Sequence, residues 1–207
     1  MEIIPVIYAH SYLPEDQIFI RGDKSKIRPI IFQVYLIKSD GRTILVDAGC
    51  ETMPGFDMKN FIGTVKALKN TGTEVSDITD VIITHAHHDH IECVKYFSKA
   101  VIHIQKEEFS VGKKYIPDSF KVNTFDDEFS VCDNVKVIKI GGHSQGSCVV
   151  EIENNGKIYV IAGDECYLRE CLDKKIPTGN SYNLENSRNF IEKYSTENYV
   201  VFLCHDE

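Results

Sequence analysis

The sequence predicts an α/β fold in which sheets carry helices on their outer faces. Three observations predict it: apolar, β-branched segments recur along the 207 residues, amphipathic segments lie between them, and glycine-containing turns separate neighbouring strands. Strand pairs come first, then strands alternating with helices, then a second run of the same kind. Because no repeat or linker interrupts this order, we expect a single domain over residues 1–207.

Strands are expected where apolar and β-branched residues run together between turns. The apolar start of the chain predicts a first strand. Residues 30–37 and 43–49 flank Asp40-Gly41, and residues 147–153 and 157–163 flank Asn154-Asn155-Gly156. Such dipeptides are typical of tight hairpins, so both pairs are predicted to be antiparallel. Further strands are predicted at residues 80–84, 100–104, 135–140 and 199–204.

Helices are expected in four places. The first is predicted by apolar residues at helical spacing that stop near Gly72, and we expect all of them in the core: Phe56, Met58, Phe61, Ile62, Val65 and Leu68. A second helix is expected to begin around residues 89–91, and two more are expected at residues 105–112 and 184–194. Residues 9–29, 113–121 and 168–183 have no regular pattern, and such long loops shape binding sites or are mobile.

Composition excludes several classes of function. The net charge is -8 and the lysines are scattered, so no nucleic-acid partner is expected. No apolar run approaches the ~20 residues that span a bilayer, and the start lacks a basic leader, so we expect a cytoplasmic protein without a membrane partner. The odd count of seven cysteines without a C-x-x-C pair predicts reduced, buried thiols. Cys204 precedes His205, but a place in a strand is favoured over a ligand role.

The segment VIITHAHHDHIECV, residues 81–94, concentrates imidazoles at the end of a predicted strand. His85 and His87 are two residues apart, so in extended backbone both rings point to one side and can bind one cation. Asp89 and His90 follow where the chain turns into a helix, and they can bind a second cation nearby. His88 is expected to face away. We favour a metal site over an exposed polar loop.

Three further polar residues each follow a predicted strand. His143 lies in the glycine-rich turn GGHSQGS, Asp164 follows KIYVIAG, and His205 follows YVVFLC. Because strands deliver their ends to a common edge, we expect these side chains to converge. Alone, each residue type more often caps an element or lies in a core. Together with the first cluster, they indicate ligands.

These motifs, T-H-A-H-H-D-H, G-G-H-S, G-D and a final histidine, resemble the metallo-β-lactamase superfamily of metal hydrolases from ILVDAG to His205. The resemblance implies an αβ/βα sandwich of two mixed sheets with helices on the outer faces. It also implies that Asp47 orients a metal-bound histidine. The implied ligands are His85, His87 and His143 on one ion, Asp89, His90 and His205 on the other, and Asp164 between them.

Nitrogen and carboxylate ligands without thiolates suit two Zn²⁺ ions, with Fe or Mn also possible. Two such ions about 3.5–4 Å apart share a water whose pKa falls to about 7, and the hydroxide attacks a carbonyl carbon. Asp89 is expected to orient this nucleophile or pass on a proton. Structural metal sites are typically closed and rich in cysteine, so this set predicts catalysis on a small molecule.

The segment D-E-C-Y, with Tyr167 three residues after Asp164, resembles the acyl-homoserine lactonases of this superfamily, as does RECLDKKIPTG after it. Tyr167 is expected to donate its phenol to the developing oxyanion, and a tyrosine packing its ring in a loop is the equal alternative. The chain departs from that subgroup at Ile91-Glu92-Cys93, where small residues are usual, and at Gln145, where proline is common.

Other functions remain as alternatives to a hydrolase of esters or lactones. A glyoxalase II-like thioesterase shares the ligands, but relatives of that kind carry an added helical domain. A mononuclear iron persulfide dioxygenase belongs to a different reaction class. A diiron redox role is disfavoured because such proteins have Glu where His87 stands. The alternative function without catalysis is a zinc buffer. The sequence does not predict the oligomeric state.

Overall fold

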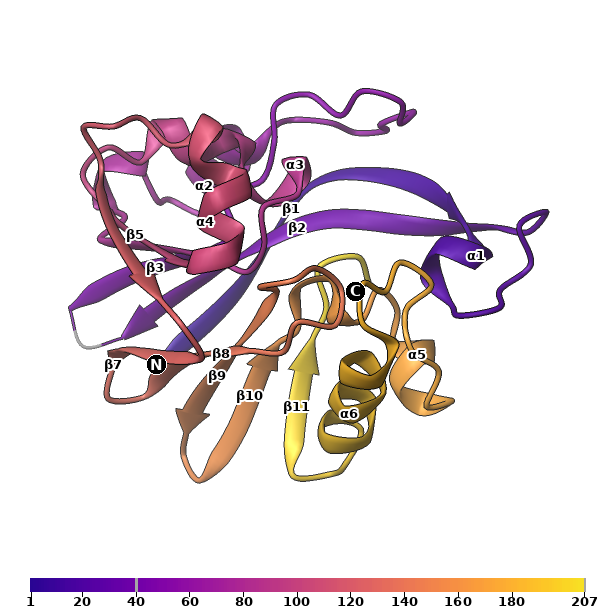
Figure 1. Ribbon diagram of the computed structural model, residues 1–207. Helices are drawn as coiled ribbons and strands as arrows, with labels where there is room; N and C mark the ends of the chain where they lie inside the picture. The colour runs from indigo at the N-terminus through magenta and orange to yellow at the C-terminus, as the bar shows by residue number, and fades with distance from the viewer. Residues whose placement is uncertain (40, 207) are drawn as a thin grey trace. The chain divides into compact units, whose positions relative to one another are not determined.

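The computed structural model describes residues 1–39 and 41–206 (Figure 1). Asp40, half of the predicted Asp40-Gly41 turn, lies outside the described residues. The chain divides into two compact units: residues 1–11 with 31–125, and residues 12–30 with 126–207. That residues 1–207 act as a single domain stays a prediction.

Unit 1 is built around most of a six-stranded sheet. Its strands follow one another in chain order: β1 (Glu2–Pro14), β2 (Ile27–Ser39), β3 (Arg42–Val46), β4 (Asp80–Ile83), β5 (Val101–Gln105) and β6 (Lys121–Phe125). β2 and β3 are antiparallel, as the predicted hairpin requires, and β3 to β6 are parallel. The sheet is therefore mixed. Its central strands β3 and β4 are largely buried, which agrees with the apolar runs ILV and VII that end them.

The helical elements of unit 1 are short. They are α2 (Thr64–Asn70), η1 (Val75–Asp77), α3 (His88–Ile91), η2 (Glu92–Tyr96), α4 (Lys106–Gly112) and η3 (Lys113–Tyr115). In Figure 1, α2 and α4 lie on the same side of the sheet. The helix predicted from Phe56 begins only at Thr64, because Gly63 has a φ of 76° that a helix cannot contain. The predicted core positions Phe61 and Ile62 are instead 36% and 38% exposed.

Unit 2 contains a five-stranded sheet in the order β11 (Tyr199–Phe202), β10 (Lys157–Ile161), β9 (Cys148–Asn154), β8 (Val135–Lys139), β7 (Glu128–Cys132). β10 and β11 are parallel and the other pairs are antiparallel, so this sheet is also mixed. The β9–β10 hairpin is confirmed. Asn155 and Gly156 both have positive φ, 53° and 74°, as a tight hairpin turn demands.

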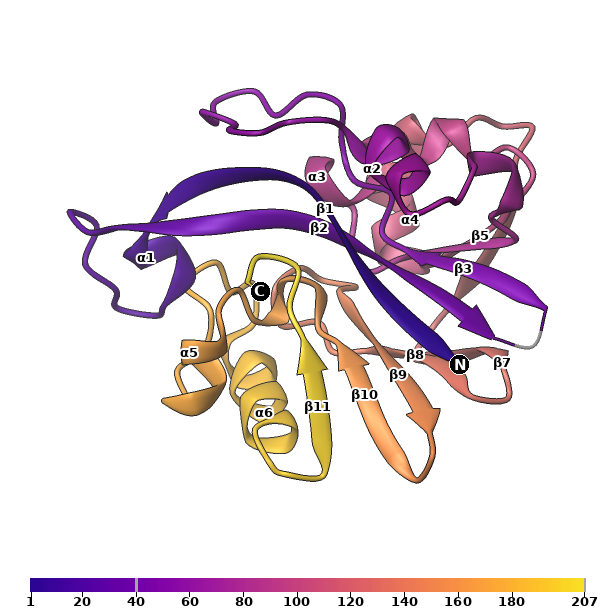
Figure 2. The same cartoon turned by 180° about the vertical axis from the view of Figure 1, so that it is seen from behind.

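The last helix, α6 (Leu184–Tyr194), has the predicted bounds. Asn183 is its N-cap, because the Asn183 side chain accepts the backbone N–H groups of Glu185 and Asn186. The helix lies beside β11 in Figure 2. The Tyr194 hydroxyl donates to Glu151 on β9, which fastens the helix to the sheet.

Several segments that were predicted to be irregular contain helices and strands. Residues 9–29 contain the end of β1, the helix α1 (Glu15–Ile18) and the start of β2. Residues 168–183 contain α5 (Arg169–Asp173), and η4 (Gly163–Glu165) precedes it. β6 and β7 were not predicted, because half-exposed strands with polar residues lack an apolar pattern. None of the helices in the described part of the chain is long and apolar enough to cross a bilayer.

Candidate functional site

The ends of β3 and β4 place the first group of predicted residues. These strands are parallel neighbours, so they end at one edge, where Asp47 follows β3 and Thr84 follows β4. The Asp47 backbone has a φ of 63° and its N–H donates to the carbonyl of Ile82 at 2.8 Å. This unusual conformation for a residue with a side chain turns the chain sharply beside the end of β4.

The buried carboxylate of Asp47 organises this edge. It accepts the Thr84 backbone N–H at 2.8 Å and the Thr84 hydroxyl at 2.9 Å, and it lies 2.7 Å from Nδ1 of His90. Because the Thr84 hydroxyl gives its hydrogen to Asp47, its oxygen accepts from Nδ1 of His85, 3.2 Å away. In both imidazoles Nδ1 therefore faces a fixed oxygen atom, and Nε2 is the nitrogen left for another partner. Metal-binding histidines are held in this way.

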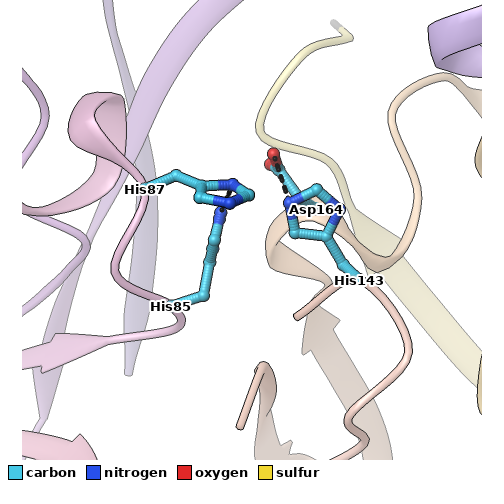
Figure 3. Close-up of side chains that lie close together, drawn as sticks. All are labelled: His85, His87, His143 and Asp164. Carbon is cyan, nitrogen blue, oxygen red and sulfur yellow. Dashed lines mark hydrogen bonds and ion pairs between the residues drawn. The ribbon is translucent and has the colours of Figure 1, made fainter. Parts of the chain in front are cut away.

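His85 and His87 extend to the same side, as their spacing predicts. Nε2 of His85 and Nδ1 of His87 lie 3.0 Å apart (Figure 3), with His85 buried and His87 exposed. His88 is bound elsewhere, with Nε2 at 2.7 Å from the carbonyl of Thr52 and Nδ1 at 3.2 Å from the Tyr115 hydroxyl. His85 and His87 thus offer two nitrogen atoms to one cation.

The short helix α3 carries the second pair of unit 1. Asp89 is 9% exposed, and its Oδ2 lies 3.5 Å from Nε2 of His90. The Tyr8 hydroxyl donates to the main-chain oxygen of Asp89 at 2.9 Å, which fixes the helix start. Buried Glu108 of α4 accepts the backbone N–H of Ala86 at 2.7 Å, so the loop between the two histidines is held as well.

Unit 2 holds the remaining three predicted ligands at one edge of its sheet. β8, β10 and β11 run in the same direction, so the residues that follow them come out at the same edge. Nε2 of His143 lies 3.4 Å from Oδ2 of Asp164 (Figure 3), and Nε2 of His205 lies 3.0 Å from Oδ1. Nδ1 of His143 donates to the main-chain oxygen of Asn180 at 2.8 Å, so Nε2 is the ring nitrogen that faces the carboxylate.

Tyr167 contacts both histidines of unit 2. Its ring stacks on His205 with centroids 4.9 Å apart and planes at 17°, and meets the ring of His143 edge-on at 6.0 Å. Asn180 Nδ2 donates to the Tyr167 hydroxyl at 3.5 Å. The side chain is 5% exposed, so its position is fixed by packing as well as by this hydrogen bond.

Glu165, directly after Asp164, has no solvent exposure. Its carboxylate accepts the backbone N–H groups of Gly142 and His143 and the Ser147 hydroxyl. Burial raises the pKa of Glu165 to about 7, although all three of these hydrogen bonds act to lower it. Cys204 is buried just past the end of β11, so the strand predicted to residue 204 ends earlier.

Within each unit the structure brings the predicted residues together. Unit 1 joins Asp47, His85, His87, Asp89 and His90, and unit 2 joins His143, Asp164, Tyr167 and His205. Sequence reasoning missed the residues that hold them: Thr84, Glu108, Glu165 and Asn180. Thr84 and Glu165 adjoin predicted ligands, which was a usable signal. Asn180 holds His143 through a main-chain oxygen, which leaves no mark in the sequence.

Comparison with protein families gives one match over most of the chain. The model described as Metallo-beta-lactamase superfamily matches residues 33–205. A probable metallo-hydrolase of Methanocaldococcus jannaschii is 32% identical over 121 residues, which cover 58% of this chain and 52% of that protein. The N-acyl homoserine lactonase AiiB of Agrobacterium fabrum is 31% identical over 106 residues, 44% of this chain and 38% of that protein. The aligned part of the chain thus spans about half the length of these curated relatives, or less.

Solved structures share the fold. An N-acyl homoserine lactone hydrolase, with the product N-hexanoyl-L-homoserine at its catalytic metal centre, gives a TM-score of 0.84 at 19% identity, covering 99% of this chain and 92% of that one. The dizinc quorum-quenching lactonase AidC gives 0.77 at 18% identity, covering 99% and 87%. With the two mixed sheets, these likenesses confirm the predicted αβ/βα sandwich as the fold class.

Proposed function

This chain belongs to the metallo-β-lactamase superfamily, and from that premise we propose that it is a dinuclear metal-dependent hydrolase of small esters or lactones. The observation that carries the proposal is the way its histidines are held. Nδ1 of His85, His90 and His143 each meets a fixed oxygen atom, so Nε2 is the nitrogen that each ring can offer to a cation.

We propose that the two groups of ligands act as one site. The donor set consists of imidazoles and carboxylates, which suits Zn²⁺, while Fe and Mn accept the same donors. Asp164 is the natural shared ligand, because its two oxygen atoms already face two different histidines, His143 and His205. The proposed assignment is His85, His87 and His143 for the first ion, Asp89, His90 and His205 for the second, and Asp164 for both.

Bound ions of this kind supply Lewis acidity and lower the pKa of a water ligand to about 7. The chain's own residues supply the rest of the proposed chemistry. In this proposal Asp89, which is mostly buried, accepts a proton from the attacking water and delivers it to the leaving group. Because Asn180 donates to the phenol oxygen of Tyr167, the phenol hydrogen can be directed at the developing oxyanion.

The proposed substrate class is a small lactone or ester. It is supported by the curated relative that is a lactonase and by Tyr167, whose ring stacks on His205, one of the proposed ligands. The phenol is a neutral donor, which suits an uncharged carbonyl group. A thioester offers the same carbonyl and is the second substrate class to assay.

The test is metal analysis of the purified protein, followed by assays on lactones, thioesters and β-lactams. About two zinc ions per chain with lactone turnover is the expected result, since two ions share the nucleophile in such sites. Thioester turnover alone would indicate a glyoxalase II-like activity. About one iron per chain with oxygen uptake would indicate a persulfide dioxygenase, and bound zinc without any turnover would indicate a zinc buffer.

Two variants link turnover to the proposed ligands. His87→Ala and Asp164→Ala should each abolish turnover and reduce the metal content. Removal of the metal by a chelator should abolish turnover of the wild type, and added zinc should restore it. Full turnover by chelated protein would refute a metal-dependent reaction.

A further inference from the structure

Glu165 contacts the turn that carries His143 from inside the protein. Its Oε1 lies 3.1 Å from the N–H of Gly142 and 3.2 Å from the N–H of His143, and it also accepts the Ser147 hydroxyl. One carboxylate oxygen thus binds both ends of the turn from residue 142 to residue 147. The carboxylate follows Asp164 directly, so it also connects this turn to the proposed bridging ligand.

The turn lies so close to this carboxylate that a side chain at position 142 would have to displace it. A Cβ atom on Gly142 would lie 2.2 Å from Oε2 of Glu165 and 2.7 Å from Oγ of Ser187. Both distances are far below van der Waals contact. The glycine of the G-G-H-S motif is therefore required by its approach to Glu165, since its backbone must come within hydrogen-bond range of the acid.

His143 is consequently held at two points. Glu165 fixes its backbone N–H, and the main-chain oxygen of Asn180 fixes Nδ1 of its ring. Together these contacts determine where Nε2 lies, 3.4 Å from Oδ2 of Asp164. A fully buried carboxylate is a costly group for holding a turn in place, because burial removes its hydration. This loss of hydration is easier to account for if the carboxylate fixes the position of a ligand.

We propose that Glu165 is a positioning residue, which fixes the backbone at His143 so that His143 and Asp164 bind the same metal ion. The inference rests on the proposed function, because it assigns His143 and Asp164 to a metal site. It does not concern the substrate. Glu165 acts through its neighbours and is not itself a ligand in this scheme.

The experiment measures zinc affinity of the full chain by competition with a chromophoric chelator. Glu165→Ala removes both backbone hydrogen bonds and should weaken zinc binding by about 10–100-fold, the effect typical of residues that hold metal ligands. Glu165→Gln keeps an oxygen acceptor and should lie between Glu165→Ala and the wild type. Glu153→Gln, on the exposed position of β9, is the matched control and should bind zinc as the wild type does.

A second measurement separates positioning from simple stabilisation. Thermal unfolding is followed with and without zinc, and positioning predicts that Glu165→Ala reduces the rise in Tm that zinc produces. Equal lowering of Tm in both conditions, with zinc affinity unchanged, would overturn the inference. If Glu165→Ala does not fold, the Co²⁺ absorption bands of Glu165→Gln decide: altered bands support positioning, and bands identical to the wild type contradict it. A wild type that binds no metal would instead overturn the proposed function, and this inference with it.

Discussion

The ion pairs around the buried carboxylate of Asp80, at the start of β4, make the stability of unit 1 depend on pH. Asp80 is 1% exposed, and its carboxylate accepts from Arg42 at 2.9 Å and from Nε2 of His103 at 2.9 Å. The Thr79 hydroxyl donates to it at 2.7 Å. Arg42, Asp80 and His103 start or lie within three neighbouring strands, β3, β4 and β5, so the network ties together the strands that carry Asp47 and His85.

The pKa of Asp80 gives the size of the effect. Burial raises this pKa, but hydrogen bonds from His103, Thr79 and Arg42 outweigh burial and lower it from 3.8 to about 2. Each unit is worth 1.36 kcal/mol, so the ionised carboxylate stabilises the fold by about 2 kcal/mol. Because the folded-state pKa is depressed, this contribution is complete above the unfolded pKa near 4 and is lost as the pH falls through about 2.

The assay is urea unfolding of metal-free wild type and Asp80→Asn at a series of pH values. The loss in free energy of unfolding caused by Asp80→Asn should be about 2 kcal/mol smaller at pH 2 than at pH 6. A further loss, from hydrogen bonds that the amide cannot make, should be the same at both pH values. Asp118→Asn is the control, because its carboxylate is exposed and lies 4.0 Å from Lys113. If Asp80→Asn lowered the free energy of unfolding equally at both pH values, the reasoning would be refuted. The network would then stabilise the fold through packing alone.

Three further variants test the site and the fold around it. Asp47→Asn should weaken zinc binding by about 10–100-fold, because the carboxylate holds His90 and, through Thr84, His85; chelator competition measures this. Tyr167→Phe should lower lactone turnover by a factor of about 10, less than the ~10²–10³ of a dedicated oxyanion donor, with zinc content unchanged; untouched turnover would disprove the carbonyl contact. Asn183→Ala should lower the free energy of unfolding by about 1 kcal/mol through loss of the N-cap of α6.

The sequence predicted the elements whose signals are local. The Asn154-Asn155-Gly156 turn determines a backbone conformation through a few neighbouring residues, and the predicted hairpin was correct, as were the predicted bounds of α6. β6 could not be predicted in this way. Its residues are mostly exposed or half-buried, and it is a strand because its backbone pairs with β5. Such pairing depends on a partner that is distant in sequence, so single-segment patterns do not contain it.

The same distinction applies within the site. The predicted ligands are histidines and aspartates that follow predicted strands, so their positions could be proposed from the sequence. Their role as one metal site stays a prediction. The contacts that hold them often use main-chain atoms, which every residue possesses. Asn180 shows the difference, because its main-chain oxygen holds His143 while its side chain meets Tyr167. Only the second contact depends on the residue being asparagine.

Asn180→Ala therefore separates the two contacts in one variant. The main-chain oxygen remains, so Nδ1 of His143 keeps its acceptor and zinc affinity should equal that of the wild type. The donor to the Tyr167 hydroxyl is lost, so turnover should fall by no more than it does in Tyr167→Phe. Since both substitutions act on the same hydroxyl, the double variant should be no slower than Tyr167→Phe alone. Zinc affinity that fell together with turnover would show instead that the asparagine side chain supports the backbone which holds His143.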